Sequence, residues 1–408
     1  MKKKLKLGVF GFGCVGQGLY HVLHETQGIK AEIKKVCVKT KNKARPVPDS
    51  FFTFDKNEIL NDLDIDIVVE LIDDANAAFE ILKASLEKGK AVVTANKKML
   101  AEHLEEIFNL QKKHGKPVLY EGSVCGSIPI IRNLEEYYDN DLIQSIEGIF
   151  NGSTNFILTK VFEENKNYTE ALKQAQELGF AESDPSLDVK GYDPKFKLVI
   201  AIAHTFGVFV KPEDVINIGI DRISDLDLKF ARENGYNIKL VARAFKSGDK
   251  IFGFVAPQFI DPTNALASVR NEYNAVQVQG AFAEKQVFIG KGAGSYPTGS
   301  AVLSDISALT YQYSYEYKKL EQAHGLTFSN ELITEAFVSF DEGTPITGND
   351  FEELQSGYAS QGKQYMVGKV TLEKLLHWSK IEGVGIILAP KAAFIPLSNI
   401  QTRSLSVA

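Results

Sequence analysis

The sequence predicts an α/β fold that begins with a doubly wound parallel sheet covered by helices on both faces. Short apolar runs alternate with amphipathic helical stretches over residues 1–130. The runs are continuously apolar, as in strands that are buried on both faces. The expected strands are Leu5–Phe10, Ile33–Val38, Ile65–Leu71, Ala91–Thr94 and Pro117–Tyr120. Helices are expected at Ala77–Glu87 and Met99–Lys113.

A second pattern, typical of an α+β arrangement, begins near residue 129. Helices are expected near 129–139, 154–163, 168–178 and 193–206, and strands near 238–245, 251–258, 275–281 and 286–289. An apolar helix follows the glycines of GAGSYPTGS, and short strands and helices fill the remainder from Leu326. We therefore expect three parts, made of residues 1–128 with 295–325, residues 129–294, and residues 326–408.

Composition narrows the class of protein. The 408 residues are too many for one small binding module, and the 44% hydrophobic and 24% charged fractions are those of a globular protein. A net charge of −6 provides no basic field for nucleic acid or anionic lipid. Three scattered cysteines fit a reducing compartment, and no apolar run reaches the ~18 residues of a membrane span. We expect a cytoplasmic protein that binds neither nucleic acid nor membrane.

A glycine-rich turn follows the first strand. Gly11, Gly13 and Gly16 in GFGCVG have the G-x-G-x-x-G spacing, and an apolar helical stripe comes next. The first glycine permits a tight turn, the second lets a pyrophosphate approach the backbone, and the third allows close packing of the helix. The helix N-terminus offers N–H groups to the anion. This arrangement predicts a Rossmann-type site for a dinucleotide.

The end of the second strand bears on the choice of cofactor. An NAD-specific site usually has a carboxylate there, for the ribose hydroxyls. This chain has Val38 and then the cations Lys39, Lys41, Lys43 and Arg45. Such a field suits the 2′-phosphate of NADP(H). A solvated basic loop is the alternative, and use of NAD(H) stays open.

A cluster of charged residues lies in FAESDPSLDVKGYDPKFK, residues 180–197. Asp193 followed by Pro194 predicts a helix start with Asp193 as the N-cap. Lys197 lies one turn further on the same side, near the positive end of the helix dipole. The acids Glu182, Asp184, Asp188 and Asp193 precede it and suit a substrate that carries an ammonium group. Solvated acids beside an ordinary cap are the alternative.

Several separated segments together resemble homoserine dehydrogenase, in that family's order and over about residues 5–320. They are GFGCVG, VVTANKKML, YEGSVCGSIPII, GIFNGSTNFIL, AQELGFAESDPSLDVKGYDPKFKLVI and GKGAGSYPTGSAVLSD. The resemblance implies an oxidoreductase acting on a CH–OH group, which reduces L-aspartate 4-semialdehyde to L-homoserine with NAD(P)H in threonine and methionine biosynthesis. It implies a dinucleotide-binding domain over 1–128 with 295–325 and a substrate-binding, catalytic and dimerisation domain over 129–294.

The resemblance also implies roles for single residues. Lys197 would be the general acid held by Asp193, Lys97 would stabilise the oxyanion, and Glu182 and Asp188 would hold the substrate's amino and hydroxyl groups. A surface lysine is the alternative for Lys97. The residues implied for the cofactor are Gly11, Gly13, Cys14, Val15, Gly16, Lys39, Thr94, Lys97, Gly292 and Gly294.

A monovalent cation, Na⁺ or K⁺, is a further implication of the resemblance. Its ligands would come mainly from main-chain carbonyls of Glu121, Val124, Gly126 and Ile128. Composition alone would make this segment a strand-to-helix turn. The family's subunits pair through the substrate domain, so a homodimer or larger homo-oligomer is implied.

The chain departs from the family's pattern at two places. Asp73 and Asp74 stand where a glycine pair is usual, near the expected cofactor channel. Members of the family often end in a regulatory ACT domain, and elements expected at 333–340, 350–358, 364–371, 372–379 and 384–389 would make residues 326–408 a small C-terminal αβ domain that resembles a divergent ACT-like module, without the D-x-P-G turn. The competing functions are another NADP-dependent amino acid or sugar oxidoreductase, and a protein that senses NADP without catalysis. A sensor would need neither Lys97 nor Lys197.

Overall fold

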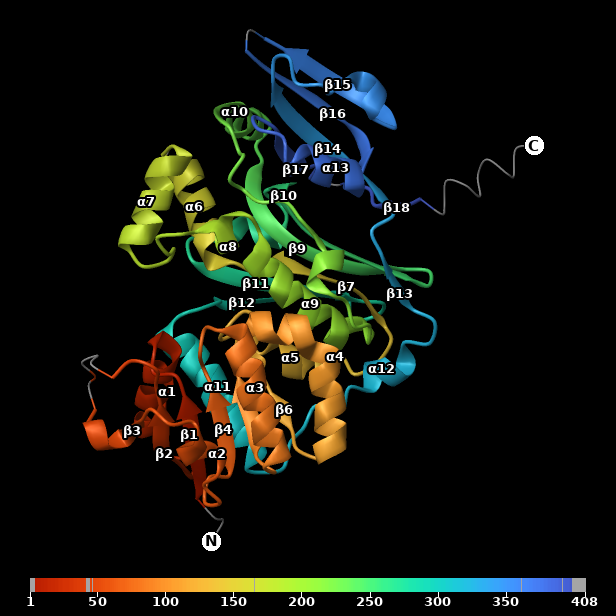
Figure 1. The fold of residues 1–408 in the computed structure, drawn as a ribbon. Helices are drawn as coiled ribbons and strands as arrows, with labels where there is room; N and C mark the ends of the chain where they lie inside the picture. The colour runs from red at the N-terminus through yellow and green to blue at the C-terminus, as the bar shows by residue number, and fades with distance from the viewer. Residues whose placement is uncertain are drawn as a thin grey trace. The chain divides into compact units, whose positions relative to one another are not determined.

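A computed structural model describes residues 4–41, 45, 47–164, 166–360, 362–390 and 392–397 (Figure 1). The chain forms two compact units, each built from two segments. Unit 1 consists of Met1–Asn140 and Gly290–Gln322, and unit 2 of Asp141–Ile289 and Ala323–Ala408. The structure thus has two units where the sequence predicts three parts, because the C-terminal block belongs to unit 2.

Unit 1 contains a parallel sheet of six strands in the order β3-β2-β1-β4-β5-β6. The strands are β1 (Leu5–Phe10), β2 (Ala31–Cys37), β3 (Phe52–Thr53), β4 (Ile67–Glu70), β5 (Ala91–Thr94) and β6 (Val118–Leu119). The chain reverses its direction of progress across the sheet between β1 and β4, and ligands of such sheets bind at this switch point, beyond the carboxyl ends of the strands. The predicted fold class is confirmed.

The helices of unit 1 are α1 (Cys14–Glu25), α2 (Asn57–Leu60), α3 (Ala75–Glu87), α4 (Lys97–His114), α5 (Ile130–Arg132), α11 (Ser295–Leu309) and α12 (Lys318–Gln322). Asp74 caps α3 by accepting from the Ala77 N–H at 3.0 Å. Asn96 caps α4 by accepting from the Met99 N–H at 3.0 Å. Both helices therefore begin two residues before the predicted starts, because a cap sets the start before the apolar pattern begins.

Helices α1 and α11 cross very closely, although they are far apart in the sequence (Figure 1). A Cβ atom on Gly18 would lie 2.0 Å from the Ser295 carbonyl oxygen, and one on Gly299 would lie 2.7 Å from the Leu19 nitrogen. Only glycine fits at these two positions. The crossing holds α11 against the helix that follows the glycine-rich turn.

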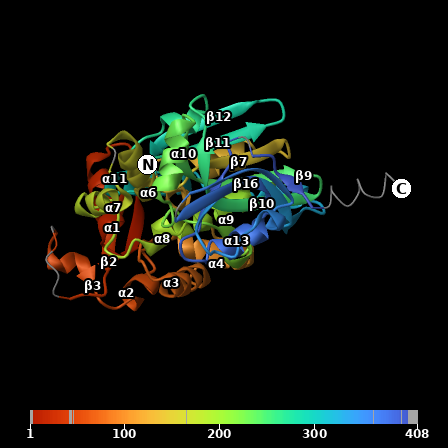
Figure 2. The same ribbon diagram turned by 90° about the horizontal axis from the view of Figure 1, so that it is seen from above.

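Unit 2 is built on a mixed sheet of twelve strands whose main path is β12-β11-β7-β9-β10-β17-β14-β16-β15. Figure 2 labels β12, β11, β7, β9, β10 and β16 of this sheet. The strands are β7 (Ile143–Ile149), β8 (Ile216–Asn217), β9 (Asn237–Ser247), β10 (Lys250–Ile260), β11 (Tyr273–Gly280), β12 (Lys285–Lys291), β13 (Thr327–Ser329), β14 (Leu332–Asp341), β15 (Glu353–Ala359), β16 (Lys363–Thr371), β17 (Gly385–Leu388) and β18 (Ile395–Pro396). Strand β7 is absent from the prediction. It lies between β11 and β9 in this sheet.

The helices of unit 2 are α6 (Gly152–Glu163), α7 (Tyr168–Glu177), α8 (Ser186–Val189), α9 (Tyr192–Phe206), α10 (Asp225–Glu233) and α13 (Leu372–Trp378). Helix α9 is buried from Asp193 to Phe206 and packs on β9 and β10. A helix buried on all sides is typical of the centre of a large core.

The C-terminal block, from Leu326 onward, shares a core with the strands that precede it in unit 2. Strand β17 pairs with β10 through Gln258 and Leu388, and β17 also pairs with β14. One apolar cluster contains Phe254 of β10 together with Val370 of β16 and Trp378 of α13. The elements predicted after residue 326 are present, but they extend the sheet of unit 2 and do not form a separate unit.

Candidate active site

The glycine-rich turn at the start of α1 has the geometry that its sequence predicts. Gly11 has φ +95°, and a Cβ atom there would lie 2.5 Å from the Leu71 carbonyl oxygen. A Cβ atom on Gly16 would lie 2.6 Å from the Gly11 carbonyl oxygen, whereas one on Gly13 would have no heavy atom within 4 Å. Gly13, the N-cap of α1, has no side chain to cover the first N–H groups. The open side of Gly13 can therefore admit an anion to the helix N-terminus.

Two other segments meet this part of unit 1. The Ser295 hydroxyl donates to the Cys14 carbonyl at 2.8 Å, so Gly292 and Gly294 lead into a helix that touches the start of α1. Gly294 has φ +121° and is the N-cap of α11. Thr94 ends β5, and Lys97 is the first residue of α4. Because β5 is a parallel strand, Thr94 and Lys97 lie at and just beyond the carboxyl edge of the unit 1 sheet.

The basic segment after β2 is exposed where the structure describes it. Lys39 and Lys41 are exposed, and Lys43 lies outside the described residues. Arg45 donates to the Thr40 carbonyl at 2.6 Å and stacks over the Phe52 ring at 4.8 Å. No carboxylate follows β2 before Asp49. The segment can present positive charge at the carboxyl end of β2.

Asp73 and Asp74, the departure from the usual glycine pair, lie directly before α3. Asp74 supplies the cap of that helix, and Asp73 is exposed beside it. Glu70, three residues earlier, is fully buried at the end of β4. Burial raises the pKa of Glu70 to about 7.

The charged cluster of unit 2 is centred on Lys197. The Lys197 ammonium donates to Asp193 Oδ2 at 2.8 Å and to the Phe150 carbonyl at 2.7 Å. Lys197 and Asp193 are each 5% exposed. One turn of α9 separates them, as predicted. Two of the three N–H groups of the ammonium are thus engaged, which leaves one for a ligand.

The prediction that Asp193 is the N-cap of α9 is wrong. The helix begins at Tyr192, and its N-cap is Gly191 with φ +81°. Asp193 lies in the first turn, where its carboxylate bonds to side chains and does not cap the helix. Pro194 still lies in the first turn, where the missing N–H of proline leaves no hydrogen bond unmade.

Asn151 connects the acids of this cluster and is absent from the predicted site. Its amide nitrogen donates to Asp188 Oδ1 at 2.6 Å and to Asp193 Oδ2 at 2.8 Å. Its amide oxygen caps α6 by accepting from the Thr154 N–H at 2.8 Å. The available signal was an Asn before a helical stretch in FNGSTNF, a common cap pattern that carries no hint of a distant partner.

Glu182 does not join this cluster. It lies exposed in the loop before α8, where its backbone carbonyl accepts from the Gln176 amide at 3.0 Å. Asp184 is also exposed and accepts from the Ser186 N–H at 3.1 Å, and hydrogen bonds from the side chain and the N–H of Ser186 lower the pKa of Asp184. The structure thus joins Asp188, Asp193 and Lys197 through Asn151 and leaves the other two acids at the surface.

The segment predicted to hold a cation is a tight, buried loop in unit 1. Cys125 and Gly126 both have left-handed backbones, with φ 54° and 52°. The Glu121 carboxylate accepts from the Ile131 and Arg132 N–H groups, each at 2.9 Å. The Ile128 carbonyl accepts from the Ile130 N–H at 2.8 Å. Among the described residues, no three His, Cys, Asp or Glu side chains gather as a metal site.

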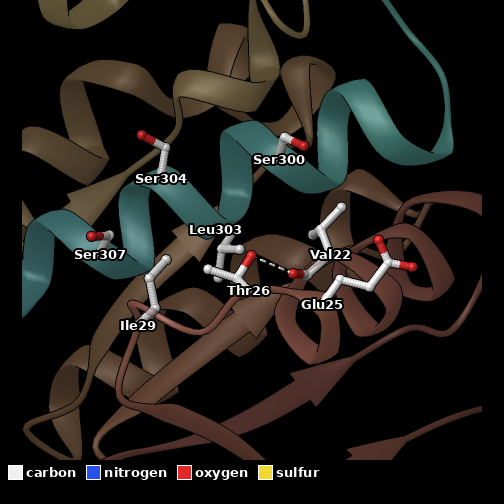
Figure 3. Close-up of a pocket in the computed structure, with 8 residues that line it drawn as sticks. All are labelled: Val22, Glu25, Thr26, Ile29, Ser300, Leu303, Ser304 and Ser307. Atoms are coloured by element: carbon white, nitrogen blue, oxygen red, sulfur yellow. Dashed lines mark hydrogen bonds between the residues drawn. The ribbon is translucent and has the colours of Figure 1, made fainter.

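A cavity of about 440 Å³ lies between α11 and the C-terminal end of α1 (Figure 3). Thr26 closes one side of it by donating to the Val22 carbonyl at 2.6 Å, and Ser300, Ser304 and Ser307 line the other. It is at the opposite end of α1 from the glycine-rich turn. The cavity is therefore separate from the predicted cofactor site.

Comparisons with known proteins identify the family of the chain. A family model described as "Homoserine dehydrogenase, NAD binding domain" matches residues 11–121, and one described as "Homoserine dehydrogenase" matches residues 129–307. The homoserine dehydrogenase of Bacillus subtilis is 40% identical over 316 residues, which cover 75% of this chain and 73% of its own. The chain belongs to the homoserine dehydrogenase family. The homoserine dehydrogenase of Helicobacter pylori is also 40% identical, over 313 residues, which cover 75% of this chain and 74% of its own.

Solved structures of the family extend the match along the chain. A homoserine dehydrogenase from Thiobacillus denitrificans has a TM-score of 0.84 at 29% identity and covers 94% of this chain and 98% of its own. The homoserine dehydrogenase of S. aureus has a TM-score of 0.73 at 31% identity, and the match covers 95% of this chain and 99% of its own. A hyperthermophilic archaeal homoserine dehydrogenase mutant in complex with NADPH has a TM-score of 0.66 at 27% identity, and the match covers 76% of this chain and 99% of its own.

Membership of the homoserine dehydrogenase family makes the chain an NAD(P)-dependent oxidoreductase of amino-acid biosynthesis with a small-molecule substrate. The predicted function and enzyme class are confirmed, and the two competing functions are set aside. In the described part of the chain, no helix has the length and apolar character needed to cross a membrane.

Proposed function

We propose that the chain reduces L-aspartate 4-semialdehyde to L-homoserine, with NADPH as the preferred cofactor. The observation that carries this proposal is the buried Lys197, which Asp193 and the Phe150 carbonyl fix in a cluster of acids. A buried ammonium with one N–H to spare is suited to an oxygen that becomes negatively charged.

Lys197 is the proton donor in this proposal. Hydride addition to the aldehyde carbon leaves the electron pair of the C=O bond on oxygen, and that alkoxide takes a proton from the Lys197 ammonium. Asp193 holds the ammonium and balances its charge. Asn151 holds Asp193 in turn, at 2.8 Å. The nicotinamide cofactor supplies the hydride when it is bound.

Lys97 and two acids, Asp188 and Glu182, are the other charged residues of the proposed site. Lys97 begins α4 beyond the carboxyl edge of the sheet in unit 1, and its positive charge stabilises the developing oxyanion. Asp188 accepts from Asn151 and also offers negative charge to the ammonium group of the substrate. Glu182, which is exposed in the loop before α8, is assigned to the same group as a second carboxylate.

The preference for NADPH rests on the exposed Lys39 and on the absence of a carboxylate directly after β2. A lysine there can pair with the 2′-phosphate. The remaining cofactor contacts are assigned to Gly11, Gly13, Cys14, Val15 and Gly16 of the turn, and to Thr94, Lys97, Gly292 and Gly294.

A monovalent cation fits the loop from Glu121 to Ile128 in the type of ligand it offers. Two successive residues, Cys125 and Gly126, have left-handed backbones, and each main-chain carbonyl of the loop keeps a second lone pair after one hydrogen bond. Carbonyls of Glu121, Val124, Gly126 and Ile128 would hold Na⁺ or K⁺, which would rigidify the loop. We also propose a cytoplasmic homodimer or larger homo-oligomer, as the family resemblance implies.

The experiment follows NADPH oxidation with aspartate semialdehyde and with a panel of other aldehydes and ketones. Turnover should be highest with aspartate semialdehyde, and Lys97→Met should lower this turnover strongly. Lys98→Met is the matched control, since Lys98 is exposed and pairs only loosely with Glu102 at 3.9 Å. Equal turnover with an unrelated ketone, or equal effects of the two variants, would contradict the assignment.

A further inference from the structure

A closed ring of hydrogen bonds ties together the loops that follow β4 and β5 in unit 1. Glu70 Oε2 accepts from the Thr94 hydroxyl at 2.6 Å, and Thr94 Oγ1 accepts from the Asn96 N–H at 3.0 Å. The Asn96 amide donates to the Ile72 carbonyl at 3.0 Å. The Ile72 N–H donates to Glu70 Oε1 at 2.7 Å, which closes the ring.

Burial makes this ring rigid. Glu70 and Thr94 are both fully buried, and they are direct partners in the register of β4 and β5. A buried carboxylate without hydrogen bonds would be costly, so the ring satisfies both oxygens of Glu70. An apolar residue would serve as well for packing alone, since the three residues before Glu70 are Ile67, Val68 and Val69.

The ring ends directly before Lys97. Asn96 belongs to the ring through its N–H and its amide nitrogen, and its amide oxygen caps α4 at the Met99 N–H. The backbone of Lys97 is therefore fixed on both sides, by the ring before it and by the first turn of α4 after it.

From this geometry we infer that Glu70 is a positioning residue for the reaction, which acts by holding Lys97 through Thr94 and Asn96. The inference rests on the proposed role of Lys97. Glu70 touches neither substrate nor cofactor in this account, and its effect on turnover is expressed through Lys97.

The chemistry of glutamine makes Glu70→Gln a specific test. Glutamine keeps the volume but has one acceptor oxygen and one donor nitrogen. If its oxygen accepts from the Ile72 N–H, its nitrogen faces Thr94 Oγ1, and the Thr94 hydroxyl loses its acceptor. In the other orientation, the amide nitrogen faces the Ile72 N–H, and two donors oppose each other. In the first orientation the glutamine nitrogen can donate to Thr94 Oγ1, which reverses that link and leaves the Thr94 hydroxyl hydrogen without its acceptor, and in the second orientation the link to Ile72 breaks.

The experiment is a double-mutant cycle on turnover of aspartate semialdehyde with Glu70→Gln and Lys97→Met. We expect Glu70→Gln alone to lower kcat on the order of tenfold, since a displacement of ~1 Å can cost up to a hundredfold. In the Lys97→Met background it should cost less than about twofold, because the group that it positions is gone.

Two further variants keep the test decisive. Asn96→Asp keeps the cap of α4 but removes the donor to the Ile72 carbonyl, so it should reproduce the effect of Glu70→Gln if that variant does not fold. Asp227→Asn is the control, because Asp227 is an equally buried carboxylate that accepts from the Ser224 N–H at 2.7 Å in unit 2. It should lose stability and keep a normal kcat.

Each outcome has a definite meaning. Equal losses from Glu70→Gln in the wild-type and Lys97→Met backgrounds would overturn the inference, as would a loss of kcat in Asp227→Asn as large as in Glu70→Gln. Normal turnover of Glu70→Gln beside an impaired Lys97→Met would overturn the inference alone. Normal turnover of Lys97→Met would overturn the proposed role of Lys97 and the inference with it.

Discussion

Replacing Lys197 by Met should have two separate effects, one on catalysis and one on stability. Met keeps an unbranched side chain but removes the proton and the charge. Loss of a positioned acid should lower turnover by about 10²- to 10⁴-fold. The structure adds a second cost, because Asp193 is 5% exposed and would lose its cationic partner. Breaking a buried ion pair from one side typically costs ~3–5 kcal/mol.

A companion substitution separates these effects. Lys197→Met/Asp193→Asn replaces both charges by neutral groups, and an Asn at position 193 can still accept from the Asn151 amide. The double variant should therefore recover most of the free energy of unfolding that Lys197→Met loses. Its turnover should stay low, because the proton donor is still missing.

The assay measures the free energy of unfolding by urea denaturation, NADPH affinity by fluorescence titration, and turnover per folded molecule. NADPH affinity should change little, since Lys197 is assigned to the substrate. A folded Lys197→Met variant with near-normal turnover would refute the assignment and leave Lys97 as the next candidate for the acid. A double variant no more stable than Lys197→Met would refute the reasoning about the buried pair.

Three other predictions concern the cofactor, the substrate and the pH dependence of stability. Lys39→Glu should raise the Michaelis constant for NADPH by a factor roughly tenfold or more larger than the factor for NADH. Lys30→Glu, at the amino end of β2, should change neither constant. Similar increases for both cofactors in Lys39→Glu would contradict the assignment of Lys39. Glu182→Gln should weaken substrate binding and spare NADPH binding, and an unchanged substrate Michaelis constant would make Glu182 an ordinary surface acid. Glu70 has a pKa raised from 4.5 to about 7, so the folded chain binds a proton that the unfolded chain releases in this window, and stability should fall by ~3 kcal/mol as pH rises through it. Denaturation at several pH values should show that the free energy of unfolding changes less steeply with pH in Glu70→Gln than in the wild type. An unchanged dependence on pH would show that another group is responsible.

The parts of the fold that the sequence predicts well are those with a strong local signal. Strands β1 and β5 have the predicted bounds, because continuous apolar runs flanked by polar residues mark a strand buried on both faces. Strand β7, with the sequence IQSIEGI, has weak apolar character, and its neighbours β9 and β11 come about 90 and 130 residues later. Pairing at that distance leaves no mark in a local pattern.

The same limit applies to the site. The spacing of Asp193 and Lys197 on one helix is a local signal, and their contact was predictable. The bond from Asn151 to Asp188 joins residues 37 positions apart and depends on how α6 and α8 pack. Glu70 did leave a local signal, an acid in an otherwise apolar strand, but its partner Thr94 is identified only by the register of β4 and β5.

The close crossing of α1 and α11 bears on how the protein is made. The Ser295 hydroxyl reaches the Cys14 carbonyl across 281 positions of the chain. On the ribosome, the glycine-rich turn therefore emerges long before the helix that packs against it. Gly18 has no side chain and packs directly against the Ser295 backbone. The face of α1 at Gly18 therefore stays exposed in the nascent chain until α11 is synthesised. Protection of α1 from proteases during translation should consequently appear late, after residues 295–309 have left the exit tunnel.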